Sequence, residues 1–380
     1  MAADAFQDVE KMLRSGRADD AFDYLADRFR EEKNYPLLFE ARMMKARHEL
    51  GMPLIAVQTP GDLAEDVQRK YDEASAEAAR EVGGLFLAAG QISRSWPYFR
   101  AIGESGPIFE AIDRLDTTED VEAIADIAFH QGVHPRKGFE LILENQGICR
   151  AITCFGQYPA GEGREESAKL LVETLHGDIV AGIKRVIEKQ EGSAPASEKI
   201  PELIAGRGWL FEGGGYYADT AHVCSVIQFG PEFHDPETLR RIVELTEYGK
   251  QLSEMFQTQG EAPFENLYED FGIYLRALLG EDVDGAIRHF RGKLEAYSPD
   301  EVGSYPAQMV VKFLVRLGRT GEAVEIFERF LTDADPQYLS CPDLLQLHQL
   351  GRKYAELQNM ARQRGDLLSF TAAMVQDPSV

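Results

Sequence analysis

A glycine followed by a small residue and then by a large apolar residue recurs along this chain. In five copies the small residue comes five or six positions after the glycine, and the apolar residue comes four positions later. The glycines are Gly16, Gly90, Gly132, Gly280 and Gly318, and Gly365 opens a looser sixth copy. A glycine often ends a helix in the left-handed conformation, and a small residue lets the next helix approach closely. The pattern therefore predicts helical hairpins.

The spacing of these copies predicts how the hairpins are arranged. Several copies lie about 38 to 47 residues apart, and the intervals from Gly16 to Gly90 and from Gly132 to Gly280 are near multiples of about 37. Such a period is typical of helical hairpins that stack on their neighbours. No segment alternates as a strand does. We therefore expect an all-α chain, specifically an α-solenoid of stacked helical hairpins.

Two segments carry a resemblance to a known family. "LVRLGRTGEAVEIFERFL" (314–331) and "RSGRADDAFDYLADRF" (14–29) resemble tetratricopeptide-like repeats, with small and large residues at the matching places. The resemblance covers roughly a third of the chain, at both ends, and its period is looser than the usual length of about 34 residues. It implies a curved array with a concave groove. Because such arrays occur in scaffolds, adaptors, peptide receptors and some enzymes, the resemblance leaves the function open.

The repeat pattern weakens in the middle of the chain, which suggests three segments. We expect N-terminal helical repeats in residues 1–150, an atypical helical region in 151–280 and C-terminal repeats in 281–380. The middle region contains predicted helices at 164–190, 235–256 and 262–280. Asp235 and Pro236 form a helix start, and Gly280 follows a helix end.

Charge and composition limit the partners. The formal net charge is −24, so the surface repels nucleic-acid phosphates and anionic membranes. Basic proteins, cations and neutral ligands remain possible partners. No apolar run is long enough to span a membrane, and the first residues do not resemble a signal peptide, which indicates a cytoplasmic protein. The four cysteines have no metal-binding spacing, and we expect free buried thiols.

The stretch "RGWLFEGGGYYADTAHVCSV" (207–226) differs from the helices around it. Its three consecutive glycines permit a sharp turn or a close approach to a ligand. Asp219 and His222 lie three residues apart at the start of a predicted helix, where they could share a divalent metal ion. The alternative is that Asp219 only caps the helix. The aromatic residues of the stretch either line a pocket or pack a turn.

Three further residues are candidates in the same region. His176 lies beside the apolar stripe of the helix predicted at 164–190, and is either a metal ligand or a satisfied core histidine. Tyr268 falls on the apolar stripe of the helix predicted at 262–280, and Glu265 borders that stripe. This carboxyl and phenol could act as catalytic acid and base, or Glu265 could only favour a helix N-terminus.

Two functions from different classes therefore remain. The first is an interaction or scaffold protein that binds a partner protein, a peptide or a small polar ligand in its concave groove. The second is a metal-dependent lyase or hydrolase. In that case His176, Asp219 and His222 would hold a divalent metal ion, and Tyr268 and Glu265 would move protons. No known nucleotide-binding or protease motif is present to decide between them.

Overall fold

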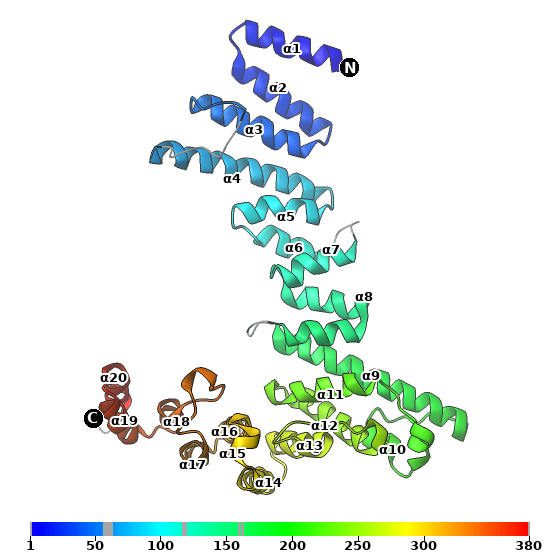
Figure 1. Cartoon of the computed structure of the whole chain (residues 1–380). Helices are drawn as coiled ribbons and strands as arrows, with labels where there is room; N and C mark the ends of the chain where they lie inside the picture. Colours follow the sequence, from blue (N-terminus) through cyan, green and yellow to red (C-terminus); the bar gives the residue numbers. More distant parts are fainter. Residues whose placement is uncertain (1, 56–63, 116–119, 159–160, 162, 379–380) are drawn as a thin grey trace. The chain divides into compact units, whose positions relative to one another are not determined.

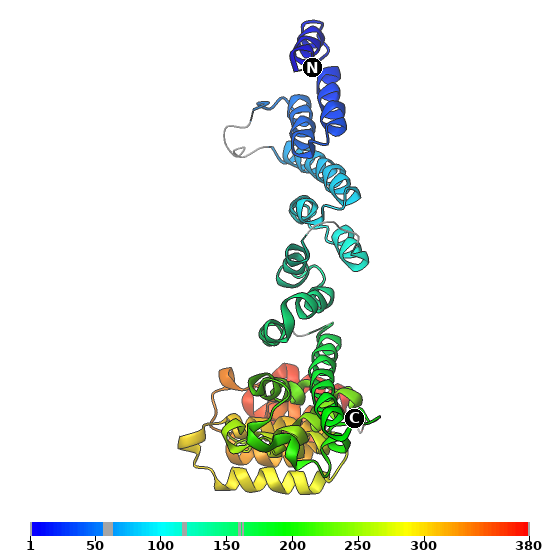
Figure 2. The ribbon, with the colours of Figure 1, turned by 90° about the vertical axis from the view of Figure 1, so that its right-hand side faces the viewer.

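The computed structural model describes residues 2–55, 64–115, 120–158, 161 and 163–378. These ranges are mostly helical and contain no strand, although an isolated antiparallel bridge joins Gln259 to Asn266. Helices that follow one another in sequence pack together (Figures 1 and 2). The all-α prediction is therefore confirmed. The chain divides into two compact units, residues 1–167 (unit 1) and residues 168–380 (unit 2). The three-part division of the sequence stays a prediction.

Unit 1 is a succession of helices in which most neighbours in sequence pack on each other, as the upper part of Figure 1 shows. The helices are α1 (Ala2–Arg14), α2 (Ala18–Glu31), α3 (Tyr35–Glu49), α4 (Glu65–Ala88), α5 (Ile92–Ala101), α6 (Gly106–Arg114), α7 (Val121–Ala125), the π-helical turn η1 (Asp126–His130) and α8 (Pro135–Gly156). Helix α8 bends at Gly147, whose φ is 82°.

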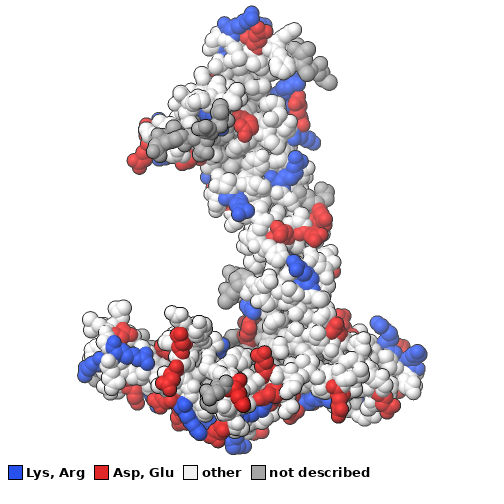
Figure 3. Space-filling model, in the orientation of Figure 1, with Lys and Arg blue, Asp and Glu red and all other residues white. Residues whose placement is uncertain are grey.

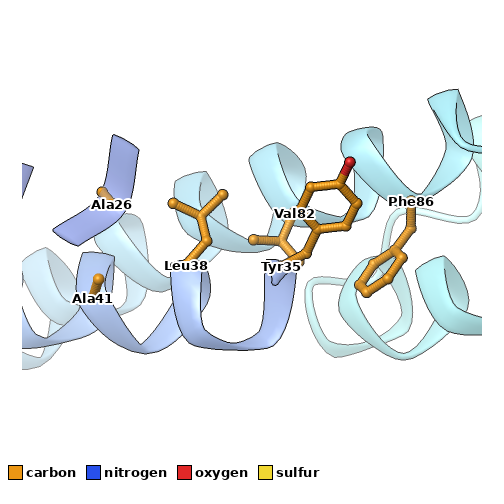
Figure 4. Close-up of a cluster of buried hydrophobic side chains, with 6 residues drawn as sticks. All are labelled: Ala26, Tyr35, Leu38, Ala41, Val82 and Phe86. Carbon is orange, nitrogen blue, oxygen red and sulfur yellow. The ribbon is translucent and has the colours of Figure 1, made fainter. Parts of the chain in front are cut away.

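The core of unit 1 forms where helices contribute small residues beside large ones. Figure 4 shows one such cluster, in which buried Ala26 and Ala41 from α2 and α3 leave room for Leu38. Tyr35 and Phe86 meet edge to face with ring centroids 4.9 Å apart, an arrangement that aromatic pairs prefer. This packing joins α2, α3 and α4.

Unit 2 contains most of the long helix α9 (Arg164–Glu191) and the helices that follow it. These are α10 (Ile200–Ile204), η2 (Gly208–Gly214), α11 (Thr220–Phe229), η3 (Gly230–Glu232), α12 (Pro236–Gln251), η4 (Glu254–Phe256), α13 (Leu267–Leu278), α14 (Val283–Ala296), α15 (Pro299–Val302), α16 (Tyr305–Arg316), α17 (Thr320–Phe330), η5 (Pro336–Tyr338), α18 (Leu344–Leu350), α19 (Tyr354–Arg364) and α20 (Leu367–Gln376). None of the described helices combines the length and apolar character that a membrane crossing requires.

The glycine pattern has the structural role that its spacing predicts. All six pattern glycines have positive φ, between 70° and 86°, so each occupies a conformation that disfavours a side chain. The small residues that follow are buried; Ala21 is 2% exposed and Ala323 is fully buried. At Gly138 a Cβ would lie 2.5 Å from the backbone nitrogen of Phe129. The pattern therefore marks close contacts between neighbouring helices.

Two helix boundaries in the middle region differ from the prediction. The helix expected to reach residue 256 ends at Gln251, because the extended backbone at Leu252 breaks it before η4. The helix expected to start beside Pro263 starts at Leu267 instead. Residues 257–266 form a loop in which the Gly260 amide donates to the Glu265 carbonyl at 3.0 Å. These ten residues shape the site described next.

Candidate functional site

A buried carboxylate lies at the centre of the polar part of unit 2. Asp270, on the first turns of α13, is fully buried. One of its oxygens, Oδ2, accepts hydrogen bonds from the Asn266 amide at 2.9 Å and from Lys293 Nζ at 2.6 Å. The other oxygen is 2.8 Å from Nε2 of His289. A buried charge is tolerated only when it is paired and hydrogen-bonded, and Asp270 meets both conditions.

Lys293 extends this network from α14 to the loop of residues 257–266. Its Nζ also donates to the Pro263 carbonyl at 2.7 Å and to Glu265 Oε2 at 2.6 Å. The loop leaves no space for a side chain at Gly260, where a Cβ would lie 2.1 Å from the Phe264 carbonyl oxygen. One ammonium group therefore links α13, α14 and the loop.

The Glu265 carboxylate is ionised in this setting. Burial by itself would raise its pKa, but the hydrogen bond and the positive charge of Lys293 outweigh burial and hold the pKa of Glu265 below its usual range. The Glu265 carboxylate therefore becomes protonated only at acidic pH.

Tyr268 points into the unit, as its place on the apolar stripe predicts, and is 2% exposed. Its hydroxyl lies 3.2 Å from Cys224 Sγ, and that sulfur lies 3.2 Å from Thr258 Oγ1. Its ring packs on Gly249, where a Cβ would come within 2.1 Å. Burial first, and then the Cys224 thiol, raise the pKa of Tyr268 far above its usual value, so its hydroxyl stays protonated at neutral pH.

Glu265 and Tyr268 border the same cavity, of about 550 Å³, which we call the polar cavity. Gln257, Thr258, Gln259 and Asn266 supply polar groups to it, and Lys250 and Glu269 form an ion pair of 2.7 Å on its wall. Glu265 and Tyr268 therefore border one hollow of unit 2, and a catalytic role for them stays a prediction.

A second cavity, of about 810 Å³, also borders the loop and is more apolar. We call it the aromatic cavity; its lining includes Phe264, Phe271, Tyr274, Tyr305, Met309, Lys312 and Arg316. Phe264 and Phe271 stack with ring centroids 4.0 Å apart, and Tyr274 meets Phe264 edge to face at 5.7 Å. Gln259 of the loop lines both cavities.

The metal candidates have other partners. His176 is buried, and its Nε2 lies 2.9 Å from Glu244 Oε2, which also accepts from the Ile200 amide at 2.8 Å. Asp219 caps α11 by accepting from the Ala221 amide at 2.8 Å, so the capping interpretation is confirmed. His222, on the first turn of α11, is partly exposed.

The metal assignment receives no support from this arrangement. His176, Asp219 and His222 do not line the polar cavity with Glu265 and Tyr268. In the part of the chain that the structure describes, no three His, Cys, Asp or Glu residues are grouped so that they could hold a metal ion. The metal site therefore stays a prediction, which the Discussion tests directly.

The aromatic residues of the glycine-rich stretch pack a turn. Phe211 meets Tyr217 and Tyr248 at centroid distances of 6.0 and 5.8 Å, and the Tyr248 hydroxyl accepts from the Tyr217 amide at 2.8 Å. Cys154, Cys224 and Cys341 are free and buried as expected, but Cys149 is exposed, which corrects the expectation for that residue.

Sequence reasoning missed Asp270, His289, Lys293 and Lys312. Acidic residues such as Glu269 and Asp270 are favoured at the start of any helix by its dipole, and nothing in the local sequence shows that Asp270 is buried. Spacing gives a partial signal, because His289 and Lys293 lie four residues apart and so share one face of α14.

Comparisons with family models, with curated proteins and with solved structures find no match to this chain. The chemistry of the site must therefore come from its residues.

Proposed function

We propose that this chain is a helical-repeat interaction protein, and that the aromatic cavity of unit 2 holds a segment of a partner protein. The observation that carries the proposal is the face of α16. Tyr305, Met309, Lys312 and Arg316 all line this cavity and follow one another at intervals of four, three and four residues, which places them on one side of the helix.

The lining combines anchoring and orienting groups, as interfaces do. Tyr305 is 47% exposed despite its size, and the aromatic rings beneath it offer an apolar floor. Aromatic residues, methionine and arginine are enriched where proteins bind partners. Arg316 already has partners within the chain, because its guanidinium donates hydrogen bonds to the backbone carbonyls of Pro231 and Phe233.

Lys312 indicates which charge the ligand should carry. Within the described residues its ammonium group forms no hydrogen bond or ion pair, although the chain carries a net charge of −24. A cation left unpaired beside an apolar floor favours a carboxylate from outside the molecule. We therefore expect a segment in which an apolar or aromatic side chain lies near an aspartate or glutamate.

Peptide selection tests this function. A display library of random dodecapeptides, selected on the full chain, is expected to yield sequences that combine an aromatic or large aliphatic residue with an acidic one. Lys312→Glu is expected to weaken their binding by about tenfold or more. The matched control is Arg240→Glu, which makes the same charge change on the exposed side of α12, where Arg240 pairs with Glu237. Equal losses in both variants would contradict the proposal.

The alternative, a metal-dependent enzyme, has one observation in its favour. Glu265 and Tyr268 line the polar cavity together, as catalytic groups would. Glu265 is held by Lys293 at 2.6 Å, however, and Tyr268 lies against Cys224 at 3.2 Å, so both groups already have protein partners. The interaction function therefore has the stronger support.

A further inference from the structure

Unit 1 has a groove whose chemistry differs from that of both cavities in unit 2. It lies between α5 and the turn made by α7 and η1, and its volume is about 990 Å³. We call it the acidic groove. Its lining includes the apolar side chains Trp96, Pro97 and Ile127 and the carboxylates of Asp120, Glu122 and Asp126.

Hydrogen bonds fix the indole and one of these carboxylates. Trp96 Nε1 donates to Gln131 Oε1 at 2.5 Å, and Gln131 Nε2 donates to Asp126 Oδ2 at 2.9 Å. Gln131 therefore holds the aromatic ring on α5 and the carboxylate on η1 in fixed positions. A preorganised pair of this kind binds a ligand with less loss of side-chain entropy.

The backbone behind Asp126 is also held in place. η1 is a π-helical turn, closed by the Gln131 amide donating to the Asp126 carbonyl at 3.1 Å. Gly138 of α8 packs directly on this turn, since a Cβ there would lie 2.5 Å from the Phe129 nitrogen. π-Helical turns are rare and are often found at functional sites.

Two carboxylates of the groove are bound by neutral donors, because Asp120 caps α7 by accepting from the Glu122 amide at 3.1 Å and Asp126 accepts from Gln131, whereas other acidic residues of unit 1 are in ion pairs. Glu81 is paired with Arg42 at 2.8 Å and Glu104 with Arg80 at 2.7 Å. Asp120, Glu122 and Asp126, in contrast, are in no ion pair with any described residue. The cationic residue of the lining, Arg100, is directed at Gln131, with 3.4 Å between Nη1 and Oε1.

Figure 3 shows acidic side chains gathered where α7 lies in Figure 1. Three carboxylates against one arginine give the lining a negative charge beside an aromatic ring. A cation with a flat apolar face complements both features.

We propose that the acidic groove binds an arginine side chain of a basic partner protein. A guanidinium stacks on an indole and donates to carboxylates through its planar array of N–H groups. Lysine fits less well, because its ammonium is compact and strongly hydrated. The net charge of −24 also attracts basic partners from solution. This surface lies in a different unit from the proposed partner cavity and takes a ligand of opposite charge.

Binding of a labelled peptide of alternating arginine and glycine, followed by fluorescence anisotropy on the full chain, tests this proposal. We expect Trp96→Ala to weaken binding by about fivefold and Asp126→Asn by about threefold. The same peptide with lysine in place of arginine is expected to bind about threefold more weakly, and a glutamate peptide not to bind. Because Asp126 is exposed, Asp126→Asn keeps the test valid if Trp96→Ala fails to fold.

The control is the surface of α4, which offers acidic residues without an aromatic ring. Glu65, Asp72 and Glu73 line a shallow hollow there, of about 680 Å³. Asp72→Asn removes the same charge as Asp126→Asn and should leave binding unchanged. If the two variants weaken binding equally, or if lysine and arginine peptides bind alike, then only the overall charge attracts the peptide and the proposal is overturned. Lys312→Glu should not weaken this binding, so a failure here is distinct from a failure of the proposed function.

Discussion

Unit 1 and unit 2 are both built from packed helices, but they bury different kinds of groups. Among the described residues of unit 1 the buried polar side chains are Ser95, His134 and Ser167, and Ser95 donates to the Gly83 carbonyl at 2.7 Å. Unit 2 fully buries the Asp270 carboxylate, which meets the partly exposed side chains of His289 and Lys293 from α14. Ion pairs also join helices of unit 1, where Glu81 of α4 pairs with Arg42 of α3. The charged network of unit 2 differs because it centres on a fully buried carboxylate and holds a loop. Residues of that loop line both cavities.

The two tryptophans allow each unit to be followed by itself. Trp96 lies in unit 1 and Trp209 in unit 2, and the chain has no others. In a Trp209→Phe background the fluorescence reports unit 1, and in a Trp96→Phe background it reports unit 2. Each comparison below can be read with this pair of backgrounds.

The largest expected difference comes from the buried polar groups. Asp270→Asn removes the charge that Lys293 and His289 face, and breaking a buried ion pair costs about 3 kcal/mol or more. We expect the lower end, because Glu265 still pairs with Lys293 at 2.6 Å. Urea unfolding followed through Trp209 measures this loss.

Ser95→Ala is the counterpart in unit 1. It removes one neutral hydrogen bond and is expected to cost about 1 kcal/mol, followed through Trp96. If both substitutions cost the same, the buried carboxylate of unit 2 does not distinguish the stability of the two units.

The second test concerns close helix contacts. Gly138→Ala would push a Cβ against the backbone of η1, which cannot move aside as a flexible side chain can. We expect a loss of about 2 kcal/mol in unit 1. In unit 2, Gly249→Ala meets the buried ring of Tyr268 and should cost a similar amount.

Two helical glycines with open space around them serve as controls. A Cβ at Gly84 of α4 or Gly177 of α9 would meet nothing within 4 Å. Alanine at either position should stabilise the helix by about 0.5 to 1 kcal/mol, because alanine loses less backbone freedom on folding. A loss at Gly84 as large as that at Gly138 would show that helix geometry, rather than contact distance, limits these positions.

Much of this architecture was predictable, because it follows from contacts between residues close in sequence. Gly16 and Gly318 end helices as their spacing indicates, and Ala323 is buried where the next helix begins. The start of α12 at Asp235 follows from the capping rules. These features depend on residues close together in the chain, so they can be predicted from a single sequence.

The site was only partly predictable, because its geometry comes from residues far apart in the chain. Tyr268 was recognised from its stripe, but its partner Cys224 lies 44 positions away. His176 was recognised as shielded, but Glu244, 68 positions away, could not be inferred as its partner. The loop of residues 257–266 resembled the start of a helix, since Pro263 and the acidic residues after it suit a first turn. Only the packing of α14 shows that Lys293 binds this segment while it forms a loop and not a helix.

The third test compares how the stability of the two units depends on pH, and it uses the buried His348 of unit 2. Burial lowers the pKa of His348 in α18, and Lys353 acts in the same direction against the opposing charges of Glu356 and Glu328. A lowered folded-state pKa means that the unfolded chain takes up the proton more readily. The stability contributed by neutral His348 is therefore complete above about pH 6.5 and is lost as the pH falls through the folded-state value.

We expect the melting temperature reported by Trp209 to fall between pH 7.5 and pH 5.5, and to fall less steeply in His348→Gln. The Trp96 signal should show the same pH dependence in both proteins, because His348 belongs to unit 2. Parallel pH curves for wild type and variant in the Trp209 signal would contradict the prediction.

The smallest expected effect concerns the cap of α11, and it also tests the metal hypothesis. If Asp219 only accepts from the Ala221 amide, Asp219→Asn should be nearly neutral, because asparagine caps as well as aspartate, whereas Asp219→Ala should cost about 1 kcal/mol. His222→Gln should also cost little.

A shared metal ion would give a different order of effects, since loss of any ligand lowers metal affinity at least tenfold and removes the metal's stabilising effect. Melting temperatures of the wild type, of these variants and of His176→Gln, with and without Zn²⁺, Mn²⁺ or Ni²⁺, distinguish the two. We expect no metal response in the wild type and a measurable loss only for Asp219→Ala and His176→Gln, the latter because Glu244 would lose its buried partner. A metal-dependent rise in the wild type that Asp219→Asn and His222→Gln abolish would instead establish the metal site and favour the enzyme.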